Sequence, residues 1–191
     1  AANLGNLGNV SLWCDYIFLD TEERKNFAQN PHEYLIETLQ ENTETVTVAA
    51  TDNVKLTFNH PVKELVWVYG DDESLGDYCQ SGDRANDEPL ESALLQLNGQ
   101  DRFASRTVEY FTQVQVYQHH TGKPVAGVNC YSFALKPEEH QPSGTCNFSR
   151  IDNAELRVTQ AATAPTQLNI FAHGYNVLRV ASGMGGLAYS N

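Results

Sequence analysis

The stretch 131–159 constrains the fold most, because it joins two strand-like runs through a long polar turn. The apolar residues that alternate with their neighbours are Tyr131, Phe133 and Leu135 in the first run and Ala154, Leu156 and Val158 in the second. A period of two is typical of a strand that packs on at least one face. Pro137 and Gly144 lie between the runs and favour turns. The stretch therefore predicts two β-strands and a connecting loop, and nothing in the loop looks nucleophilic.

The same residues carry a family resemblance. The run SFALKPEEHQPSGTCNFSRIDNAEL closely resembles a segment of the major capsid proteins of large icosahedral double-stranded DNA viruses, the nucleocytoplasmic group that includes iridoviruses and algal viruses. Further stretches that agree are NVSLWCDYIFLDTEERKNFAQNPHEYLIE near the start, LTFNHPVKELVWV from Leu56, YQHHTG from Tyr117 and NVLRVASGMGGLAYSN at the end. The resemblance spans most of the chain, and strand or helix composition alone does not produce such an irregular loop.

Members of this family carry two jelly rolls in tandem. The resemblance implies that residues 1–191 form a single jelly-roll domain, the C-terminal half, and that the N-terminal jelly roll of the family is absent from this chain. The start at Ala1 without a methionine suggests a cut piece. A single-roll relative that uses six copies stays open, because three single jelly rolls cannot give the sixfold outline that three double ones give.

The resemblance also implies a structural role. Three copies of the two-domain protein would form a homotrimer with a near-hexagonal outline, and these capsomers would tile an icosahedral shell over an internal viral membrane. The expected partners are neighbouring capsomers and minor capsid proteins, and the expected location is the virion capsid, assembled in the host cytoplasm. No enzymatic activity and no cofactor are expected.

Length and charge limit the possibilities independently. A chain of 191 residues suits one domain that buries about 70% of the surface its unfolded form exposes. The net charge of -12 would repel phosphate backbones, so no nucleic-acid partner is expected. The chain has no run of 18 apolar residues, and its opening AANLGNLGN does not resemble a signal peptide.

The pattern along the chain predicts an all-β, eight-stranded jelly-roll sandwich with short helices in the connecting loops. Strands are expected at 9–19, 44–50, 54–59, 62–69, 128–135, 152–160, 167–173 and 176–181, with 44–59 forming a hairpin. An inserted loop region at about 70–127 contains an acidic tract that we expect to be solvated. Long connections and this insertion favour a jelly roll over an up-and-down barrel.

Two helices are expected between the first two strands. Asp20 can cap a helix with Glu23 three residues on. Asn30 and Pro31 repeat such a start, and Tyr34, Leu35, Ile36 and Leu39 follow at helical spacing. Residues 105–118 could form a strand or a short helix, and the family resemblance favours the helix. Ser182 to Gly186 read as a flexible tail.

Large apolar side chains in the expected strands should hold the sandwich together. The candidate structural core is Trp13, Tyr16, Phe58, Trp67, Phe133 and Leu156. Each of these side chains would contribute about 1.5–3 kcal/mol on burial.

Histidine and cysteine spacing argues against a metal centre. The six histidines, at 32, 60, 119, 120, 140 and 173, include no H-x-H pair followed by glutamate. His119 and His120 are neighbours, so on a strand they would point to opposite faces. The cysteines at 14, 79, 130 and 146 form no C-x-x-C pair, so separate buried thiols are expected, although three disulfide pairings are conceivable in a secreted chain.

Two glycosylation patterns occur, at Asn9 and Asn147. Asn147 lies in the polar loop and is the accessible candidate, but cytoplasmic assembly would bypass the secretory route, so we expect neither to be modified. Two other functional classes remain as alternatives. A carbohydrate-binding β-sandwich would use Trp13, Trp67 and some of the nine tyrosines as stacking platforms. A cupin-like metal enzyme ranks after it.

Overall fold

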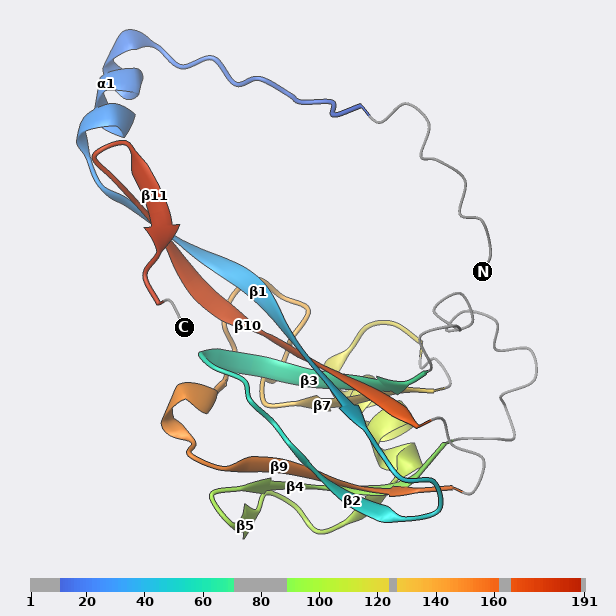
Figure 1. Ribbon diagram of the computed structural model, residues 1–191. Helices are drawn as coiled ribbons and strands as arrows, with labels where there is room; N and C mark the ends of the chain where they lie inside the picture. Colours follow the sequence, from blue (N-terminus) through green and yellow to red (C-terminus); the bar gives the residue numbers. More distant parts are fainter. Residues whose placement is uncertain (1–10, 71–88, 124–126, 162–165, 190–191) are drawn as a thin grey trace.

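Two antiparallel sheets stack face to face in the computed structural model, which describes residues 11–70, 89–123, 127–161 and 166–189 (Figure 1). The first sheet has the order β1-β10-β3-β7, with β11 on β10 and β8 on β3. Its strands are β1 (His32–Thr45), β3 (Pro61–Tyr69), β7 (Val128–Ser132), β8 (Cys146–Asn147), β10 (Gln167–Ala181) and β11 (Met184–Leu187). We call it sheet A.

Sheet B has the order β2-β9-β4-β5, with β6 on β4. Its strands are β2 (Thr51–Lys55), β4 (Leu90–Leu97), β5 (Gln100–Asp101), β6 (Arg106–Thr107) and β9 (Ala154–Gln160). The helical segments are α1 (Thr21–Gln29), a π-helical turn (Tyr110–Val114) that continues into α2 (Gln115–His119), and a 3-10 turn (Phe148–Arg150).

The chain passes back and forth between the two sheets. β1, β3, β7 and β10 belong to sheet A, whereas β2, β4 and β9 belong to sheet B, and the pairings are antiparallel. This connectivity is that of a jelly roll, so the predicted fold class is confirmed. The described residues contain eleven strands instead of the expected eight: seven main strands and the short additions β5, β6, β8 and β11.

The core lies between the sheets and is closed at one side by the helical turn before α2. Trp67 of β3 is fully buried and meets Phe111 edge to face, with ring centroids 5.1 Å apart. Leu156 of β9 faces it from sheet B at 1% exposure. Alternate residues of β9 are buried, as the period of two predicted. The helix expected within 105–118 is also confirmed, and it supplies Phe111 to the core.

Of the two helices expected near the start of the chain, one is confirmed and one is wrong. The first helix is confirmed: Asp20 caps α1 by accepting a hydrogen bond from the backbone N–H of Glu23 at 2.9 Å. The second helix is wrong, because residues 32–45 form β1, which pairs with β10 along its whole length. Hydrogen bonding to a strand more than a hundred residues away outweighs local helix signals.

The predicted hairpin over 44–59 is also wrong. β1 pairs with β10 in sheet A, whereas β2 pairs with β9 in sheet B, so the chain crosses from one sheet to the other between them. Ala49 lies in this crossing with a φ of 54°. The two strands expected at 167–173 and 176–181 form one continuous strand, β10.

The described part of the expected insertion, residues 89–123, contributes to the sandwich. β4 places Leu90 and Leu95 in the core, each 1% exposed, and forms the centre of sheet B. The acidic tract at 71–88, with Cys79, lies outside the described residues. The tail expected at 182–186 instead forms a hairpin between β10 and β11, in which Ser182 and Gly183 have φ angles of 53° and 78°, as a tight two-residue turn requires.

Candidate interaction surfaces

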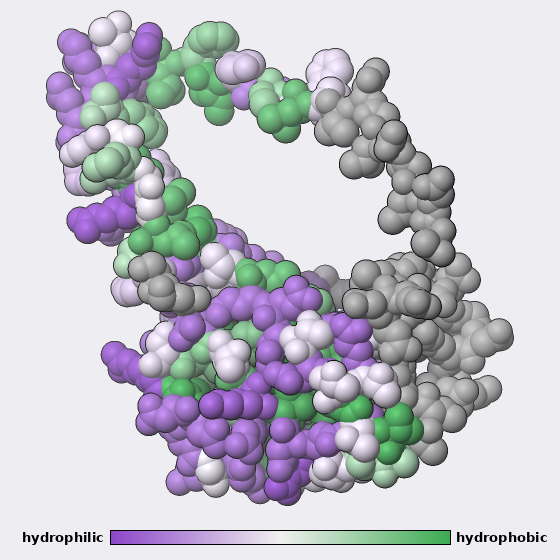
Figure 2. All heavy atoms as spheres, in the orientation of Figure 1, coloured by the Kyte–Doolittle hydropathy of each residue, from purple (hydrophilic) through white to green (hydrophobic). Residues whose placement is uncertain are grey.

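An arm of apolar residues extends from the sandwich without being covered by it. Residues 11–19 form no regular structure and contact little of the body, and α1 has no buried residue. The exposed large side chains in this arm are Leu12, Trp13, Tyr16, Ile17 and Phe18, at 81–92% exposure. Figure 2 shows hydrophobic side chains along the arm, which curves away from the largely hydrophilic face of the body.

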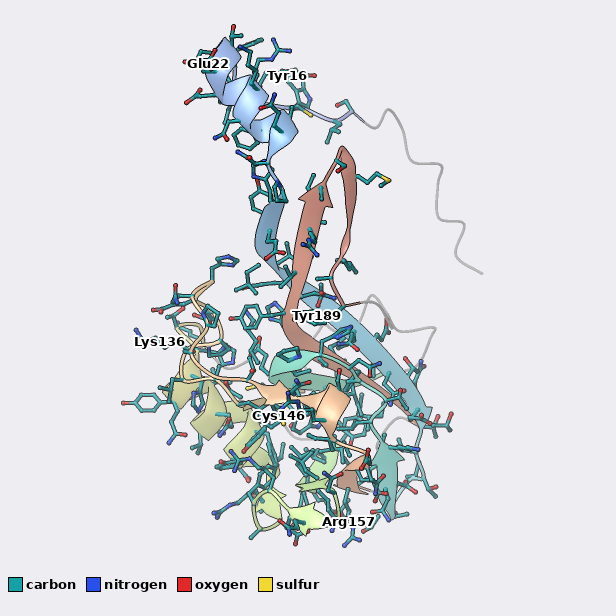
Figure 3. All side chains as sticks on the ribbon, turned by 90° about the vertical axis from the view of Figure 1, so that its left-hand side faces the viewer. Tyr16, Glu22, Lys136, Cys146, Arg157 and Tyr189 are labelled. Atoms are coloured by element: carbon teal, nitrogen blue, oxygen red, sulfur yellow. The ribbon has the colours of Figure 1, made fainter. Side chains whose placement is uncertain are left out.

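The arm is held away from the body by a projecting ribbon. β10 pairs with β1 up to His32 and Val180 and with β11 on its other side, so these strands extend together beyond the sandwich (Figure 1). Figure 3 places Tyr16 and Glu22 at the far end of this ribbon and Arg157 at the opposite end of the molecule. The apolar side chains of the arm are therefore accessible to a neighbouring domain or subunit.

The predicted core residues divide between two places. Phe58, Trp67 and Leu156 are buried in the core, at 5%, 0% and 1% exposure, and Phe133 is partly buried against it. Trp13 and Tyr16 were predicted to be buried in the first strand, and this is wrong for the described chain, where they are 91% and 81% exposed. Residues 11–19 are rich in aromatic and apolar side chains, as the predicted strand requires, but no strand of the described sandwich pairs with them.

A second surface is the outer face of sheet A, where charged side chains gather. We call this set the polar cluster: it consists of Glu37, Lys63, Glu64, His120, Glu138 and His173. It forms at a β-bulge, because His173 pairs with Glu64 and Gly174 with Val62, which leaves Lys63 without a partner on β10. A bulge re-aims side chains, so Lys63 and Glu64 both reach the cluster although they are consecutive.

Lys63 is 1% exposed, and its Nζ lies 2.8 Å from Glu37 Oε1. The Tyr175 ring packs against the same ammonium group, 5.3 Å from its centroid. The hydrogen bond from Lys63 holds the pKa of the Glu37 carboxyl below its ordinary value, with His173 acting in the same direction. Glu37 is therefore ionised at neutral pH and neutralises a buried cation.

Histidine side chains connect the carboxylates of the cluster. His173 Nδ1 is 3.0 Å from Glu64 Oε1, and its Nε2 is 3.0 Å from Glu37 Oε2. His120, just after α2, has Nε2 3.2 Å from Glu64 Oε2 and Nδ1 3.3 Å from Glu138 Oε1. The cluster thus joins β1, β3 and β10 to the end of α2 and to the loop before β8.

Glu138 anchors that loop. It accepts hydrogen bonds from the backbone N–H and the hydroxyl of Thr121, at 3.0 and 2.6 Å. These bonds, with His120 as a lesser cause, hold the pKa of Glu138 below its ordinary value. The backbone N–H groups of Phe133 and Ala134 both donate to the Lys63 carbonyl, at 2.9 and 3.1 Å. The loop is therefore fastened to the bulge by main-chain and side-chain contacts together.

Shallow hollows flank Val66 on this face. One, of about 400 Å³, is lined by Glu37, Thr38, Leu39, Glu64, Val66, Phe171 and His173. The other, of about 240 Å³, includes Val66, Val116, His120, Lys123, Cys130 and Glu138 in its lining. Burial, with a smaller contribution from Glu64, raises the pKa of the Cys130 thiol to about 12, so this cysteine is an inert thiol.

Within the described ranges, no three His, Cys, Asp or Glu side chains are arranged to hold a metal ion. Cys14, Cys130 and Cys146 are free thiols there. Among the helices of the described residues, none is long and apolar enough to cross a membrane.

The two remaining candidates from the sequence have ordinary structural roles. Asn147 caps the 3-10 turn by accepting from the Ser149 N–H at 3.1 Å, and the Ser149 hydroxyl accepts from the His60 N–H at 2.8 Å. Whether Asn147 is modified stays a prediction. Trp67 is buried, so it is not available to stack on a sugar, which removes one of the two tryptophans behind the carbohydrate-binding alternative.

Sequence reasoning did not single out the polar cluster. A signal was present, since Lys63 and Glu64 interrupt an otherwise apolar strand, and buried charges are rarely unpaired. The resemblance pointed to YQHHTG and to the loop with Glu138, and the structure brings His120 of the first and Glu138 of the second together.

Comparison with known proteins agrees with the fold. The family model for the large eukaryotic DNA virus major capsid protein matches residues 23–186. The major capsid protein of Pyramimonas orientalis virus is 49% identical over an alignment covering 100% of this chain and 51% of the relative. The major capsid protein of Paramecium bursaria Chlorella virus 1 is 46% identical, covering 95% and 54%.

Solved structures show the same architecture. The VP54 capsid protein of Paramecium bursaria Chlorella virus 1 superposes with a TM-score of 0.81 at 44% identity, covering 92% of this chain and 56% of VP54. The Faustovirus major capsid protein, at 15% identity and a TM-score of 0.64, shares the fold and covers 86% and 36%. The chain spans about half the length of the curated relatives it matches.

Proposed function

Because the chain belongs to the large eukaryotic DNA virus major capsid protein family, we propose that it is one jelly-roll half of a capsid protein that tiles an icosahedral shell. In this role the sandwich is a rigid wall, and its loops, arm and projecting ribbon make the contacts with neighbouring domains and subunits. The protein catalyses no reaction and uses no cofactor. Nucleic acid is not among its partners, since the net charge of -12 would repel phosphate backbones.

The structural observation that best supports this proposal is the exposure of the arm. Residues 11–19 place five large apolar side chains in solvent, and soluble monomers rarely leave such a contiguous apolar stretch uncovered. Trp13 makes only a local hydrogen bond, from Nε1 to Ser11 Oγ at 3.2 Å. A chain built to act alone would fold such a segment onto its own sheets, whereas here the sandwich is complete without it.

The domain that covers the arm is the other jelly roll of the longer protein. The relatives are about twice as long as this chain, which leaves room for a further domain of similar size. The aromatic and β-branched residues of 9–19 suit a strand of that domain, and α1 then connects the two sandwiches. The N-terminal jelly roll of the family supplies the missing cover for Trp13 and Tyr16.

Three such two-domain chains form a homotrimer with a near-hexagonal outline. Neighbouring capsomers, minor capsid proteins and an internal viral membrane are its partners in the virion, which is assembled in the host cytoplasm. Each contact can be weak, since a closed lattice repeats it many times and stability grows by multivalency.

The test is the mass and outline of the full-length protein expressed alone. Sedimentation and negative-stain microscopy should give trimers with a hexagonal outline. Stable monomers that do not associate at any tested concentration would contradict the proposal. Hexamers of the chain 1–191 alone, with the arm buried between copies, would favour a single-roll tile.

A further inference from the structure

The inner face of sheet A continues beyond the sandwich. Leu168, Ile170 and Ala172 of β10 point into the core and are each 0% exposed. Successive side chains of a strand alternate between faces, so Leu178 and Val180 lie on the same side of the sheet as these core residues. Both belong to the projecting ribbon of β1, β10 and β11, which extends past sheet B (Figure 1). The side of sheet A that sheet B covers in the body is therefore uncovered in the ribbon.

Apolar side chains form a cross-strand row on this face. Tyr34 of β1 pairs with Leu178 of β10, which pairs in turn with Leu187 of β11. Directly opposite residues of an antiparallel pair lie on one face, with their Cβ atoms about 5 Å apart. Tyr34 and Leu187 are 45% and 50% exposed, although they lie on the core-facing side of the sheet. We call this set the ribbon face: it consists of His32, Tyr34, Ile36, Leu178, Val180 and Leu187.

The two sides of the ribbon differ in charge. None of the six residues of the ribbon face is Asp, Glu, Lys or Arg. The opposite side carries the ion pair of Glu33 and Arg179, in which Oε1 and Nε are 3.3 Å apart and both side chains are well exposed. An exposed ion pair is stable in contact with water, whereas an aromatic and aliphatic surface without charges is typical of the fully covered centre of an interface. The ribbon face is therefore the side that a partner would cover.

The ribbon face is continuous with α1. The Phe27 ring of α1 stacks on the His32 ring, with centroids 4.9 Å apart, and the His32 ring stacks on the Tyr34 ring at 6.2 Å. Phe27 is itself more than half exposed. The apolar surface of the ribbon therefore begins on the helix that leads from the arm.

The short connection through α1 limits what can lie against this face. The nine residues of α1 span about 14 Å. The proposed function makes the arm a strand of the other jelly roll, and a domain of about 200 residues has a radius of gyration of about 16 Å. That domain is wider than the connection is long, so it is held beside the outer end of the ribbon. The apolar surface within its reach is the ribbon face.

We propose that the ribbon face is the docking surface for the other jelly roll of the same polypeptide, which covers Tyr34, Leu178 and Leu187 together with Phe27. The inference rests on the proposed two-domain protein and deepens it, because it assigns one face of the ribbon to the contact between the two sandwiches. The opposite side of the ribbon, with Glu33, lies outside this contact.

Hydroxyl-radical footprinting of the full-length protein, read by mass spectrometry, tests which side of the ribbon is covered. Leu187 lies on the ribbon face and Leu35 on the opposite side, so two side chains of the same kind can be compared. In this sandwich alone Leu187 is the more exposed, at 50% against 39%. In the full-length protein Leu187 should be modified at least about fivefold more slowly than Leu35. Faster modification of Leu187 than of Leu35 would overturn the proposal.

Photo-crosslinking identifies the domain that covers the ribbon face. With benzoylphenylalanine in place of Tyr34, irradiated full-length protein should keep the mass of one chain in denaturing electrophoresis, and position 34 should be joined to a peptide of the other jelly roll. Covalent dimers would show that a second copy covers this face, and they would overturn the assignment while leaving the capsid role intact. An intrachain cross-link in a protein that sediments only as a monomer would do the reverse.

Paired substitutions test whether the contact depends on the apolar face. Leu187→Asp places a charge on the ribbon face, and Leu35→Asp places the same charge on the opposite side. Neither residue is buried in this sandwich, so both variants should fold. The yield of the intrachain cross-link from position 34 should fall at least about fivefold in Leu187→Asp, because the charge would be buried without a partner, and should be retained in Leu35→Asp. An unchanged yield in Leu187→Asp, or an equal loss in both variants, would contradict the proposal.

Discussion

Gly174 lies directly against the backbone carbonyl of Pro61. A Cβ at position 174 would overlap the Pro61 oxygen and would lie 3.1 Å from the Val62 Cα. This close approach occurs where β10 changes register against β3, between His173 and Gly174. The absence of a side chain at Gly174 therefore permits the bulge that presents Lys63.

The first prediction concerns this contact. Gly174→Ala should lower the free energy of unfolding by about 3 kcal/mol, because the neighbouring atoms are backbone and cannot move aside as a flexible side chain would. The measurement is urea denaturation of the chain 1–191. Gly186→Ala is the control, since a Cβ there meets nothing within 4 Å, and it should be nearly neutral. Equal effects at both positions would contradict the packing described here.

The second prediction compares the two tryptophans. Trp67→Ala should cost about 3–5 kcal/mol, because the side chain is fully buried against Phe111. Trp13→Ala should leave the unfolding of the chain 1–191 within about 0.5 kcal/mol of wild type, because its side chain is 91% exposed. In the full-length protein, Trp13→Ala should be destabilising. A strong effect of Trp13→Ala on the short chain would show that the arm folds onto this sandwich.

The third prediction is an acid dependence of stability. The folded pKa of Glu37 is lowered, first by the Lys63 hydrogen bond, so its contribution is present above the ordinary glutamate value and is lost as the pH falls through the folded one. Lys63→Met should remove about 1–3 kcal/mol at pH 7 and flatten the dependence below about pH 4.5. Denaturation curves from pH 3 to pH 7 measure both, and an unaltered acid limb in Lys63→Met would be inconsistent with the pair.

The fourth prediction concerns thiol reactivity. Cys130 is 4% exposed and its pKa is raised to about 12, so iodoacetamide at pH 8 should not modify it in the folded protein. Cys14 is exposed and should react in the chain 1–191. In the full-length trimer Cys14 should become protected, because it lies in the arm. Mass spectrometry of the alkylated peptides gives both results, and rapid labelling of Cys130 would contradict its burial.

Local signals were sufficient for part of the fold. The cap at Asp20 correctly placed α1, a nearly continuous apolar run correctly placed β3, and alternation of apolar residues correctly placed β7 and β9. The jelly-roll class followed from strand spacing and from the family resemblance. These elements are encoded in residues that are close together in the sequence.

Elements that depend on distant partners were not predictable in this way. β1 carries a helix-like pattern at Tyr34 and Leu35 but becomes a strand because β10 is available beside it. The arm at 11–19 has the composition of a strand but no partner sheet in the described chain. Periodicity indicates which face is apolar and does not indicate which sheet will cover it.

The polar cluster was missed for a related reason. Lys63 and Glu64 are neighbours, and a regular strand would send them to opposite faces. Only the bulge opposite Gly174 brings both to His173, and its position depends on the register with β10. The residues of the cluster can therefore be found in the sequence, but their spatial arrangement cannot be predicted from it.

The most direct test of the proposed role is a side-chain-resolution cryo-electron microscopy reconstruction of the full-length protein. The account predicts a trimer of hexagonal outline in which this sandwich occupies every second corner and residues 11–19 pair as a strand of the adjoining jelly roll, with Trp13 buried there. A reconstruction in which residues 11–19 stay exposed, or in which the protein is a monomer, would contradict it.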